Sequence, residues 1–245
     1  VCCELQPLIG GKIDKVQQPD RDALLLSVRQ GGQNHRLLLS AHAENGRVQL
    51  TEQSFVNPPE PPMFCMLLRR RLAGGRIVSI RQRELDRVLT IAVETHNELG
   101  DPIEVQLVTE LMGKHSNIIF VLPDGTVGDC IKHVGPQMSS VRTLLPGCSF
   151  HEAPVQDKIN PLIAPAAALQ DALEAPNPVK ALSDRFFGLS RSTLQALLGE
   201  GLSCQQLHER MQRFSAGCFS PTIVENAFGE PVSVFPFAPA AGGGA

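Results

Sequence analysis

The stretch IEVQLVTELMGKHSNIIFV, residues 103–121, contains two runs of strand-forming residues around a Gly-Lys-His-Ser-Asn loop. β-Branched residues are enriched in both runs and turn residues bound them, as in two neighbouring antiparallel strands. Similar runs recur on both sides of this stretch. We therefore predict an antiparallel meander built from residues 76–84, 86–95, 103–112, 117–125 and 126–134.

Elements of other kinds flank the meander. Residues 22–29 and 35–42 predict a hairpin around a Gly-Gly turn, and prolines before and glycines after residues 61–73 predict one helix. Beyond Ser149 the periodicity and composition become helical. The expected fold class is α+β, with a β-rich module over 1–165, a helical unit over 166–218, strand-like residues 219–237 that could complete the first sheet, and a poorly assigned tail over 238–245.

Composition places the chain among folded, soluble proteins. Its 245 residues, 42% of them hydrophobic, suffice for one substantial core and a smaller unit. The seven cysteines are an odd set without a C-x-x-C pair, which favours reduced thiols and a cytoplasmic location. Apolar runs stay well short of the ~20 residues of a membrane-spanning helix, so no membrane partner is expected. Both ends look truncated, because the chain opens on Val1.

Motifs for common enzyme chemistry are missing from the sequence. The seven histidines show no H-E-x-x-H spacing and none lies beside a cysteine pair, so no metal site is expected. There is no G-x-S-x-G and no P-loop, and the doublets Gly10-Gly11 and Gly74-Gly75 lack the order that binds dinucleotides. We expect no catalytic residue, no cofactor and no small-molecule substrate.

Arginines are concentrated between residues 69 and 87. Seven arginines lie there against two acidic residues, an excess that the net charge of -3 conceals. Guanidinium groups fork onto phosphate oxygens, so a nucleic-acid contact is one interpretation. The other is structural, because residues 69–71 occupy the last turn of the predicted helix, where cations complement the helix dipole. The expected phosphate contacts in this segment are Arg69, Arg70, Arg76, Arg81 and Arg83.

Seven blocks in one order make the chain resemble the N-terminal region of the NFACT family. They are LIGGKIDKVQQP, LLLSAHAENGRVQLT, NPPEPPMFCMLLRRRLAGGRI, LDRVLTI, ELMGKHSNIIFV, IKHV and VRTLLPG. The resemblance is close over residues 5–161 and loose beyond them. It implies a first module similar in fold to the N-terminal domain of formamidopyrimidine-DNA glycosylases, followed by a small helix-hairpin-helix unit.

NFACT proteins act in ribosome quality control, and the resemblance implies that role here. The implied partners are the large ribosomal subunit with peptidyl-tRNA, and tRNA recruited to extend the stalled chain without a template, with alanine in bacteria. The family's tRNA-recruiting Asp-Arg dyad matches Asp86 and Arg87. Arg87 can fork to a phosphate or base edge while Asp86 accepts hydrogen bonds. The structural alternative is a salt-bridged strand start, where neighbouring side chains point to opposite faces.

The loop between the two runs of the opening stretch resembles a Met-Gly-Arg-His-Ser-Asn block of the family, with Lys114 in the Arg position. We predict that Gly113 reverses the backbone and that Asn117 tolerates a left-handed conformation, with Lys114 and His115 pointing outward. Lys114, His115 and Arg142 join the expected phosphate contacts. For His115, burial as a hydrogen-bonded turn residue is the favoured alternative.

The helical region and the aromatic content bear on RNA binding. Gly188 is expected in a turn, with Ser190 or Ser192 capping the next helix, as in a helix-hairpin-helix element or in ordinary helix packing. The sequence has no Trp and no Tyr, which leaves few platforms for base stacking. We therefore expect weak, salt-sensitive RNA binding by this chain.

Two rival functions stay open. A surface adhesin is suggested by the older label of bacterial NFACT proteins as fibronectin-binding proteins, but the unpaired cysteines and the lack of a visible export segment oppose it. A DNA-binding protein like the formamidopyrimidine-DNA glycosylases is suggested by fold similarity alone. The N-terminal Pro-Glu pair of those enzymes has no counterpart near Val1–Glu4.

Overall fold

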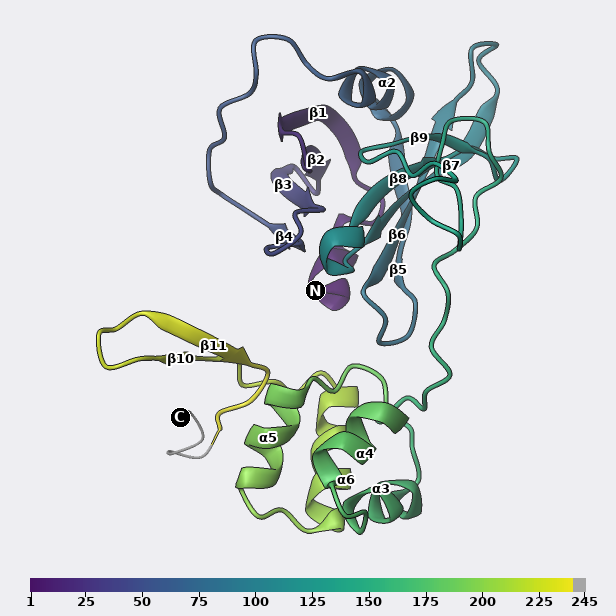
Figure 1. Cartoon of the computed structure of the whole chain (residues 1–245). Coiled ribbons are helices and arrows are strands. Elements are labelled where there is room, and N and C mark those ends of the chain that lie inside the picture. The colour runs from purple at the N-terminus through teal and green to yellow at the C-terminus, as the bar shows by residue number, and fades with distance from the viewer. Residues whose placement is uncertain (240–245) are drawn as a thin grey trace. The chain divides into compact units, whose positions relative to one another are not determined.

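The computed structural model in Figure 1 describes residues 1–239, so the end of the predicted tail, 240–245, lies outside the described residues. The chain divides into two compact units, one formed by residues 1–83 and 87–154 and the other by residues 84–86 and 155 onward. The boundary thus lies earlier than the predicted residue 165. The reason is local pairing, because Ile159 forms a parallel bridge with Phe186, and the Lys158 ammonium donates to the Ser183 carbonyl at 2.7 Å.

The first unit is built on a nine-stranded sheet with the order β4-β3-β2-β1-β5-β6-β7-β8-β9. Neighbouring strands pair antiparallel, which confirms the predicted meander and the predicted hairpin with its left-handed Gly31 and Gly32. The strands are β1 (Lys12–Asp20), β2 (Ala23–Gln30), β3 (Gln33–Ser40), β4 (Arg47–Leu50), β5 (Arg76–Gln82), β6 (Val88–His96), β7 (Pro102–Glu110), β8 (Asn117–Val121) and β9 (Val127–Cys130).

Glycines form the joint between the two halves of this sheet, β1–β4 and β5–β9. At the joint the Ile13 amide donates to the Gly75 carbonyl, and the Gly74 amide to the Ile13 carbonyl, both at 2.8 Å. A Cβ on Gly75 would lie 2.8 Å from Val93 Cγ1, and one on Gly11 would lie 2.7 Å from Val28 Cγ1. Gly11 and Gly75 therefore allow close backbone approach beside the joint.

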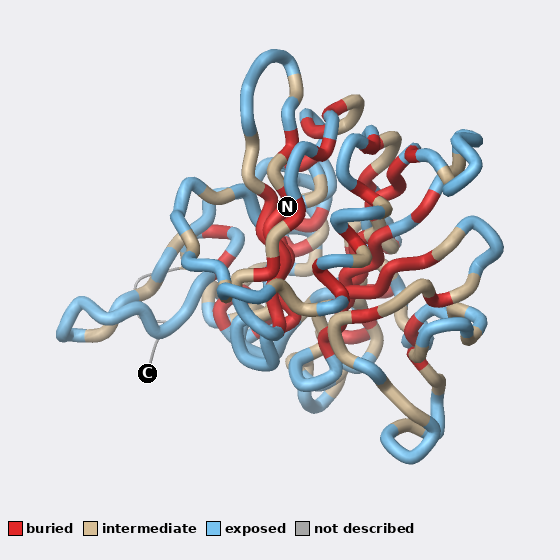
Figure 2. The backbone as a smooth tube through the Cα atoms, turned by 90° about the horizontal axis from the view of Figure 1, so that it is seen from above, coloured by how far each residue is buried: buried red, intermediate tan, exposed pale blue. Residues whose placement is uncertain are grey.

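One hydrophobic core lies between the inner faces of the two half-sheets. Leucine, isoleucine and valine side chains from β1–β4 and from β5–β8 meet there. Helix α2 (Met63–Leu72) matches the predicted helix and lies across one end of both halves in Figure 1, burying Phe64, Leu68 and Leu72 in this core. Figure 2 shows these buried segments in red. Each such side chain contributes roughly 1.5–3 kcal/mol by leaving water. The short helices α1 (Cys2–Leu5) and η1 (Gln6–Leu8) precede β1.

A second, smaller core covers the outer face of β6–β9. It joins Val88, Val108 and Ile119 to Leu144 and the half-buried Phe150. Residues 131–154 therefore act as a covering segment on this face, and Val134 and Leu144 bridge each other within it. Strand β8 is buried along its whole length because it contacts a core on each side.

The second unit, as far as residue 239, contains four helices and a separate hairpin. The helices are α3 (Ala166–Leu173), α4 (Pro178–Arg185), α5 (Arg191–Gly199) and α6 (Cys204–Ser215), and the hairpin joins β10 (Thr222–Glu225) to β11 (Pro231–Phe235). The suggestion that residues 219–237 complete the first sheet is wrong, because β10 and β11 form their own two-stranded sheet and Phe235 and Phe237 are buried in the helical core. Among the described residues, no helix combines the length and apolar character needed to cross a membrane.

The turn between α4 and α5 has the predicted local geometry. Gly188 has φ 68°, and Ser190 caps α5 by accepting a hydrogen bond from the Thr193 amide at 3.1 Å. Such a cap satisfies one of the free amides at the start of a helix. Ser190, rather than Ser192, is therefore the N-cap. The assignment to the helix-hairpin-helix class stays a prediction.

Candidate nucleic-acid interface

The Asp-Arg dyad lies in the hairpin loop between β5 and β6. The loop spans residues 83–87 and is closed by the Arg83 amide, which donates to the Val88 carbonyl at 3.1 Å. Asp86 is half-buried and Arg87 is exposed. The sequence-based alternative placed both at a strand start, but β6 begins only at Val88. Alternation of strand faces therefore does not separate the two side chains.

The dyad loop contains a left-handed residue that is not glycine. Glu84 has φ 47°, and it is the one non-glycine residue with positive φ in residues 1–239. Residues outside the Asn, Asp and Gly types seldom adopt this conformation, and such strain is concentrated at functional sites. Glu84 thus gives the dyad loop a backbone conformation that its residue type disfavours.

A backbone hydrogen bond joins the dyad to the second predicted loop. The Leu111 amide donates to the Arg87 carbonyl at 2.8 Å, and Val88 pairs with Glu110 where β6 begins and β7 ends. Leu111 directly precedes the Met112–Asn117 loop. The structure therefore brings Arg87 and the Gly-Lys-His-Ser-Asn loop together at the same end of β6 and β7, although about 25 residues of chain separate them.

The Met112–Asn117 loop is a single turn with an outward-facing tip. Gly113 has φ 58° and begins the short helix η2 (Gly113–His115), and the buried Ser116 hydroxyl accepts from the Met112 amide at 2.9 Å. Lys114 and His115 are both exposed, as a phosphate contact requires. The alternative of a buried His115 is wrong, because Ser116 and Asn117 take the buried positions of the turn.

Asn117 has a role that differs from the prediction. It is the first residue of β8 with extended backbone, not left-handed, and it is buried. Its side-chain amide donates to the Lys132 carbonyl at 2.8 Å, and its carbonyl oxygen accepts from the Lys132 amide at 3.1 Å and the Ile118 amide at 2.9 Å. Asn117 thus fastens the base of the loop to the chain that follows β9.

A cavity of about 510 Å³ adjoins this loop. Lys114, His115 and His133 contribute cationic or titratable groups to its wall, and Met112, Met138 and Val141 contribute apolar ones. The covering segment forms the opposite wall. The cavity therefore offers apolar contact beside donors of hydrogen bonds, a combination suited to a ligand with an anionic group.

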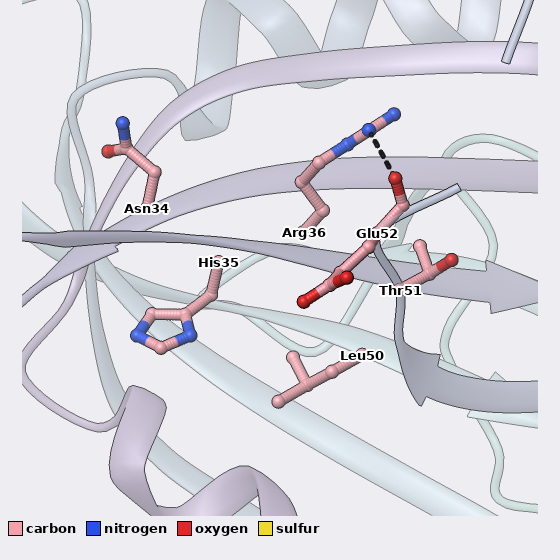
Figure 3. A pocket seen from close by; sticks show the side chains of 6 residues that line it. All are labelled: Asn34, His35, Arg36, Leu50, Thr51 and Glu52. Carbon is pink, nitrogen blue, oxygen red and sulfur yellow. Dashed lines mark hydrogen bonds between the residues drawn. The ribbon is translucent and has the colours of Figure 1, made fainter. Parts of the chain in front are cut away.

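A cavity of similar volume, about 510 Å³, lies elsewhere in the first unit, at the end of β4 (Figure 3). Arg36 donates there to the Glu52 carbonyl at 3.4 Å, and His35 and Leu50 point to the other side of the strands. Its lining contains no residue predicted to contact RNA. It is therefore separate from the candidate interface.

Arg142 does not lie free for a phosphate. Its Nη1 donates to Glu110 Oε1 at 2.8 Å and to the His151 carbonyl at 2.9 Å, and its Nη2 pairs with Glu110 Oε2. The Arg142 side chain is 12% exposed and that of Glu110 is 1% exposed. The expected phosphate contact is wrong for Arg142, because a buried carboxylate and a backbone carbonyl already occupy the guanidinium.

Several arginines of the 69–87 cluster also have structural partners. Arg69 Nε donates to the Val16 carbonyl at 2.8 Å and Arg76 Nη1 to the Gly10 carbonyl at 2.5 Å, although both side chains remain partly accessible. Arg83 Nη1 bonds Glu152 at 3.0 Å and the Ala153 carbonyl at 2.8 Å. The cluster is therefore dispersed over the unit. Arg70 on α2 and Arg81 on the outer face of β5 are exposed.

Comparison with known proteins places these features in a family. Residues 1–236 match the model described as NFACT N-terminal and middle domains. The chain is 40% identical over 233 residues to "Rqc2 homolog RqcH" of Streptococcus pneumoniae, an alignment that covers 91% of this chain and 42% of that protein. It is 44% identical over 160 residues to the protein of the same name from Bacillus subtilis, covering 65% of this chain and 28% of that protein. The chain thus spans less than half the length of these relatives.

A solved structure has the same overall fold. The N-terminal part of the fibronectin/fibrinogen-binding protein from Streptococcus suis superposes with a TM-score of 0.84 at 37% identity, covering 98% of this chain and 88% of that one. The comparison supports a mixed α+β fold around a large antiparallel sheet. The similarity to formamidopyrimidine-DNA glycosylases stays a prediction.

Proposed function

Because the chain belongs to the NFACT family, we propose that it is the tRNA-recruiting part of a ribosome quality-control factor. The factor binds an obstructed large ribosomal subunit that carries peptidyl-tRNA, and it supplies tRNA for untemplated alanine addition to the stalled chain. In this proposal the protein acts in the cytoplasm and recognises RNA without catalysing a reaction. The relatives named RqcH support the ribosome-associated role.

One observation carries the assignment of the binding residues. The exposed Arg87 lies in a loop whose backbone is bonded to Leu111, directly before the loop that exposes Lys114 and His115. Three donors of charge-assisted hydrogen bonds thus come from two adjacent loops. Donors of this kind suit contacts to phosphates or to a phosphate and a base edge. Asp86 is assigned the acceptor role for an exocyclic amine or a ribose hydroxyl.

The experiment is a purification of the full-length protein from cells, with the Asp86→Ala and Arg87→Ala variants beside the parent protein. We expect large ribosomal subunits to co-purify with all three proteins, while tRNA falls sharply with the two variants. Arg29→Ala, a change of an exposed arginine on β2, is the matched control and should keep both RNAs. Equal tRNA in the parent and both dyad variants would overturn the assignment.

Fibronectin binding is the second candidate function, because the superposed Streptococcus suis protein carries that description. The two functions differ in their dependence on RNA-binding residues. Immobilised fibronectin and tRNA can be presented to the same purified chain, before and after ribonuclease treatment. Saturable fibronectin binding that survives ribonuclease and the Arg87→Ala change would favour the adhesin function.

A further inference from the structure

Three potential metal ligands converge at the end of β9. One donor atom each of Asp129, Cys130 and His133 lies within 4.8 Å of the other two. The absence of a cysteine pair and of paired histidines gave no reason to expect this cluster. The three residues, spaced as D-C-x-x-H, come together because the strand ends at Cys130 and the chain turns there.

The three side chains differ in depth. The Cys130 residue is 3% exposed, and its thiol lies 3.1 Å from the Lys132 carbonyl and 3.3 Å from the Leu144 carbonyl. The Asp129 side chain is 17% exposed and the His133 side chain 57%, and Asp129 Oδ1 lies 2.7 Å from His133 Nε2. A cation could therefore reach the cluster from the side of His133.

The backbone around the cluster is held on both sides. Asn117 bonds both the amide and the carbonyl of Lys132. Val134 and Leu144 exchange two backbone hydrogen bonds, at 3.0 and 2.8 Å, immediately after His133. The turn that gathers the three side chains is thus fixed before any ligand binds, which reduces the entropic cost of binding.

The electrostatic environment favours a cation. The Asp129 carboxylate brings a negative charge to the cluster, and the Lys132 and Leu144 carbonyl oxygens lie 3.1 and 3.3 Å from the thiol. The Lys132 ammonium does not neutralise the cluster, because it donates to the Ala41 carbonyl at 2.5 Å and lies 3.7 Å from Asp22.

We propose that Asp129, Cys130 and His133 form a zinc-binding site with one position left for water. Tetrahedral zinc holds sulfur at about 2.3 Å and nitrogen or oxygen at about 2.0–2.2 Å, which places the donors roughly 3.3–3.7 Å from one another. The separations of 2.7 to 4.8 Å in the cluster need shifts of only about 1 Å. On binding, the Cys130 S–H bond breaks, the proton passes to buffer and an S–Zn bond forms.

Zinc at this site would bridge β9 to the start of the covering segment. Because the segment also forms a wall of the cavity beside Lys114 and His115, the ion would stabilise one side of the RNA interface. A ligand that binds only the folded chain increases the free energy of unfolding, and the increase grows with the ligand concentration. The site itself does not depend on the proposed function, since its ligands are separate from the dyad.

The test uses Co²⁺ as a spectroscopic probe and Zn²⁺ in competition with a chelating dye, on the reduced 245-residue chain. We expect a thiolate-to-cobalt charge-transfer band, displacement of Co²⁺ by Zn²⁺, and release of about one thiol proton per ion bound. Cys130→Ser should abolish the band. His133→Gln and Asp129→Asn should weaken Zn²⁺ binding about tenfold or more.

Controls separate this site from the other cysteines. Cys148→Ser changes a half-buried thiol of the covering segment outside the cluster, and Cys2→Ser with Cys3→Ser changes the adjacent pair near the N-terminus. Both controls should retain the cobalt band. Thermal unfolding in chelator checks that every variant is folded. A band that is missing from the parent chain, or that persists in Cys130→Ser, would overturn the proposal.

Discussion

The carboxylate of Glu110 is buried against the guanidinium of Arg142, and two hydrogen bonds join them. Glu110 is the last residue of β7, directly before the chain leads into the Met112–Asn117 loop, and Arg142 belongs to the covering segment. If one member of a charge pair at this depth is removed, the other charge stays buried without compensation, which strongly destabilises the fold. The pair therefore holds the covering segment on the sheet beside the loop.

Loss of one partner of this pair is expected to be severe. Glu110→Ala leaves the Arg142 charge buried without its partner and should lower the free energy of unfolding by about 3–5 kcal/mol. Glu98→Ala, which removes the exposed partner of Arg71, is the matched control and should cost about 0–1 kcal/mol. Urea unfolding followed by circular dichroism measures both. Similar losses in the two variants would show that the buried pair is dispensable.

Removal of the Asn117 side chain should destabilise the base of the loop. Asn117→Ala deletes a donor and an acceptor that together bond both backbone groups of Lys132, and the buried groups left behind cost about 1–3 kcal/mol. Asn34→Ala, at an exposed asparagine of β3, should change stability little. Hydrogen exchange at the Lys132 amide is the direct readout, and unchanged protection in Asn117→Ala would contradict this role.

The glycine joint predicts a steric penalty. Gly75→Ala places a Cβ 2.8 Å from Val93 Cγ1 on β6 and 3.1 Å from the Leu72 carbonyl at the end of α2, so these neighbours must shift at a cost of about 1–3 kcal/mol. Gly135→Ala is the control, because a Cβ there meets nothing within 4 Å. Comparison of the two urea midpoints tests the prediction. A neutral Gly75→Ala would mean that the joint is not closely packed.

The Cys130 thiol predicts a loss of stability in alkali. Its pKa is raised to about 12 in the folded chain from an ordinary 9.0, so the unfolded chain releases this proton first. The contribution of the thiol to the free energy of unfolding is fully present below its pKa in the unfolded chain. It is lost as the pH rises from 9 toward 12, by roughly 1.4 kcal/mol per pH unit at most. In chelator-containing buffer, Cys130→Ala should show a flatter dependence than the parent. Parallel curves would refute the assignment.

Local sequence patterns predicted most strands of the large sheet, but not β1 and β4. The runs that became β6, β7 and β8 are rich in β-branched residues, and tertiary packing agrees with their propensity. Strand β1 was missed because it carries Lys12, Asp14 and Pro19, and its pairing with β2 and β5 is a tertiary choice. Strand β4 was missed because its 4 residues are too few to show an alternating pattern.

The candidate site was predicted only where its residues lie close in the sequence. The dyad, Gly113 and the exposed Lys114 follow from local blocks and turn chemistry. The engagement of Arg142 by Glu110, 32 residues away, and of Arg83 by Glu152, 69 residues away, depends on long-range packing that no spacing rule encodes. The D-C-x-x-H cluster was missed for the same reason, since its geometry depends on the Asn117 contact.

The most direct measurement is the affinity of the purified chain for tRNA as a function of salt, for the parent and for Arg87→Ala. The account predicts that Arg87→Ala weakens binding by about 1–3 kcal/mol and reduces the magnitude of the salt slope by about one, while the Arg29→Ala control keeps both values. Asp86→Ala should weaken binding without reducing the magnitude of the salt slope. Affinity for tRNA that is the same in the parent and in Arg87→Ala, or that does not change with salt, would contradict the central claim.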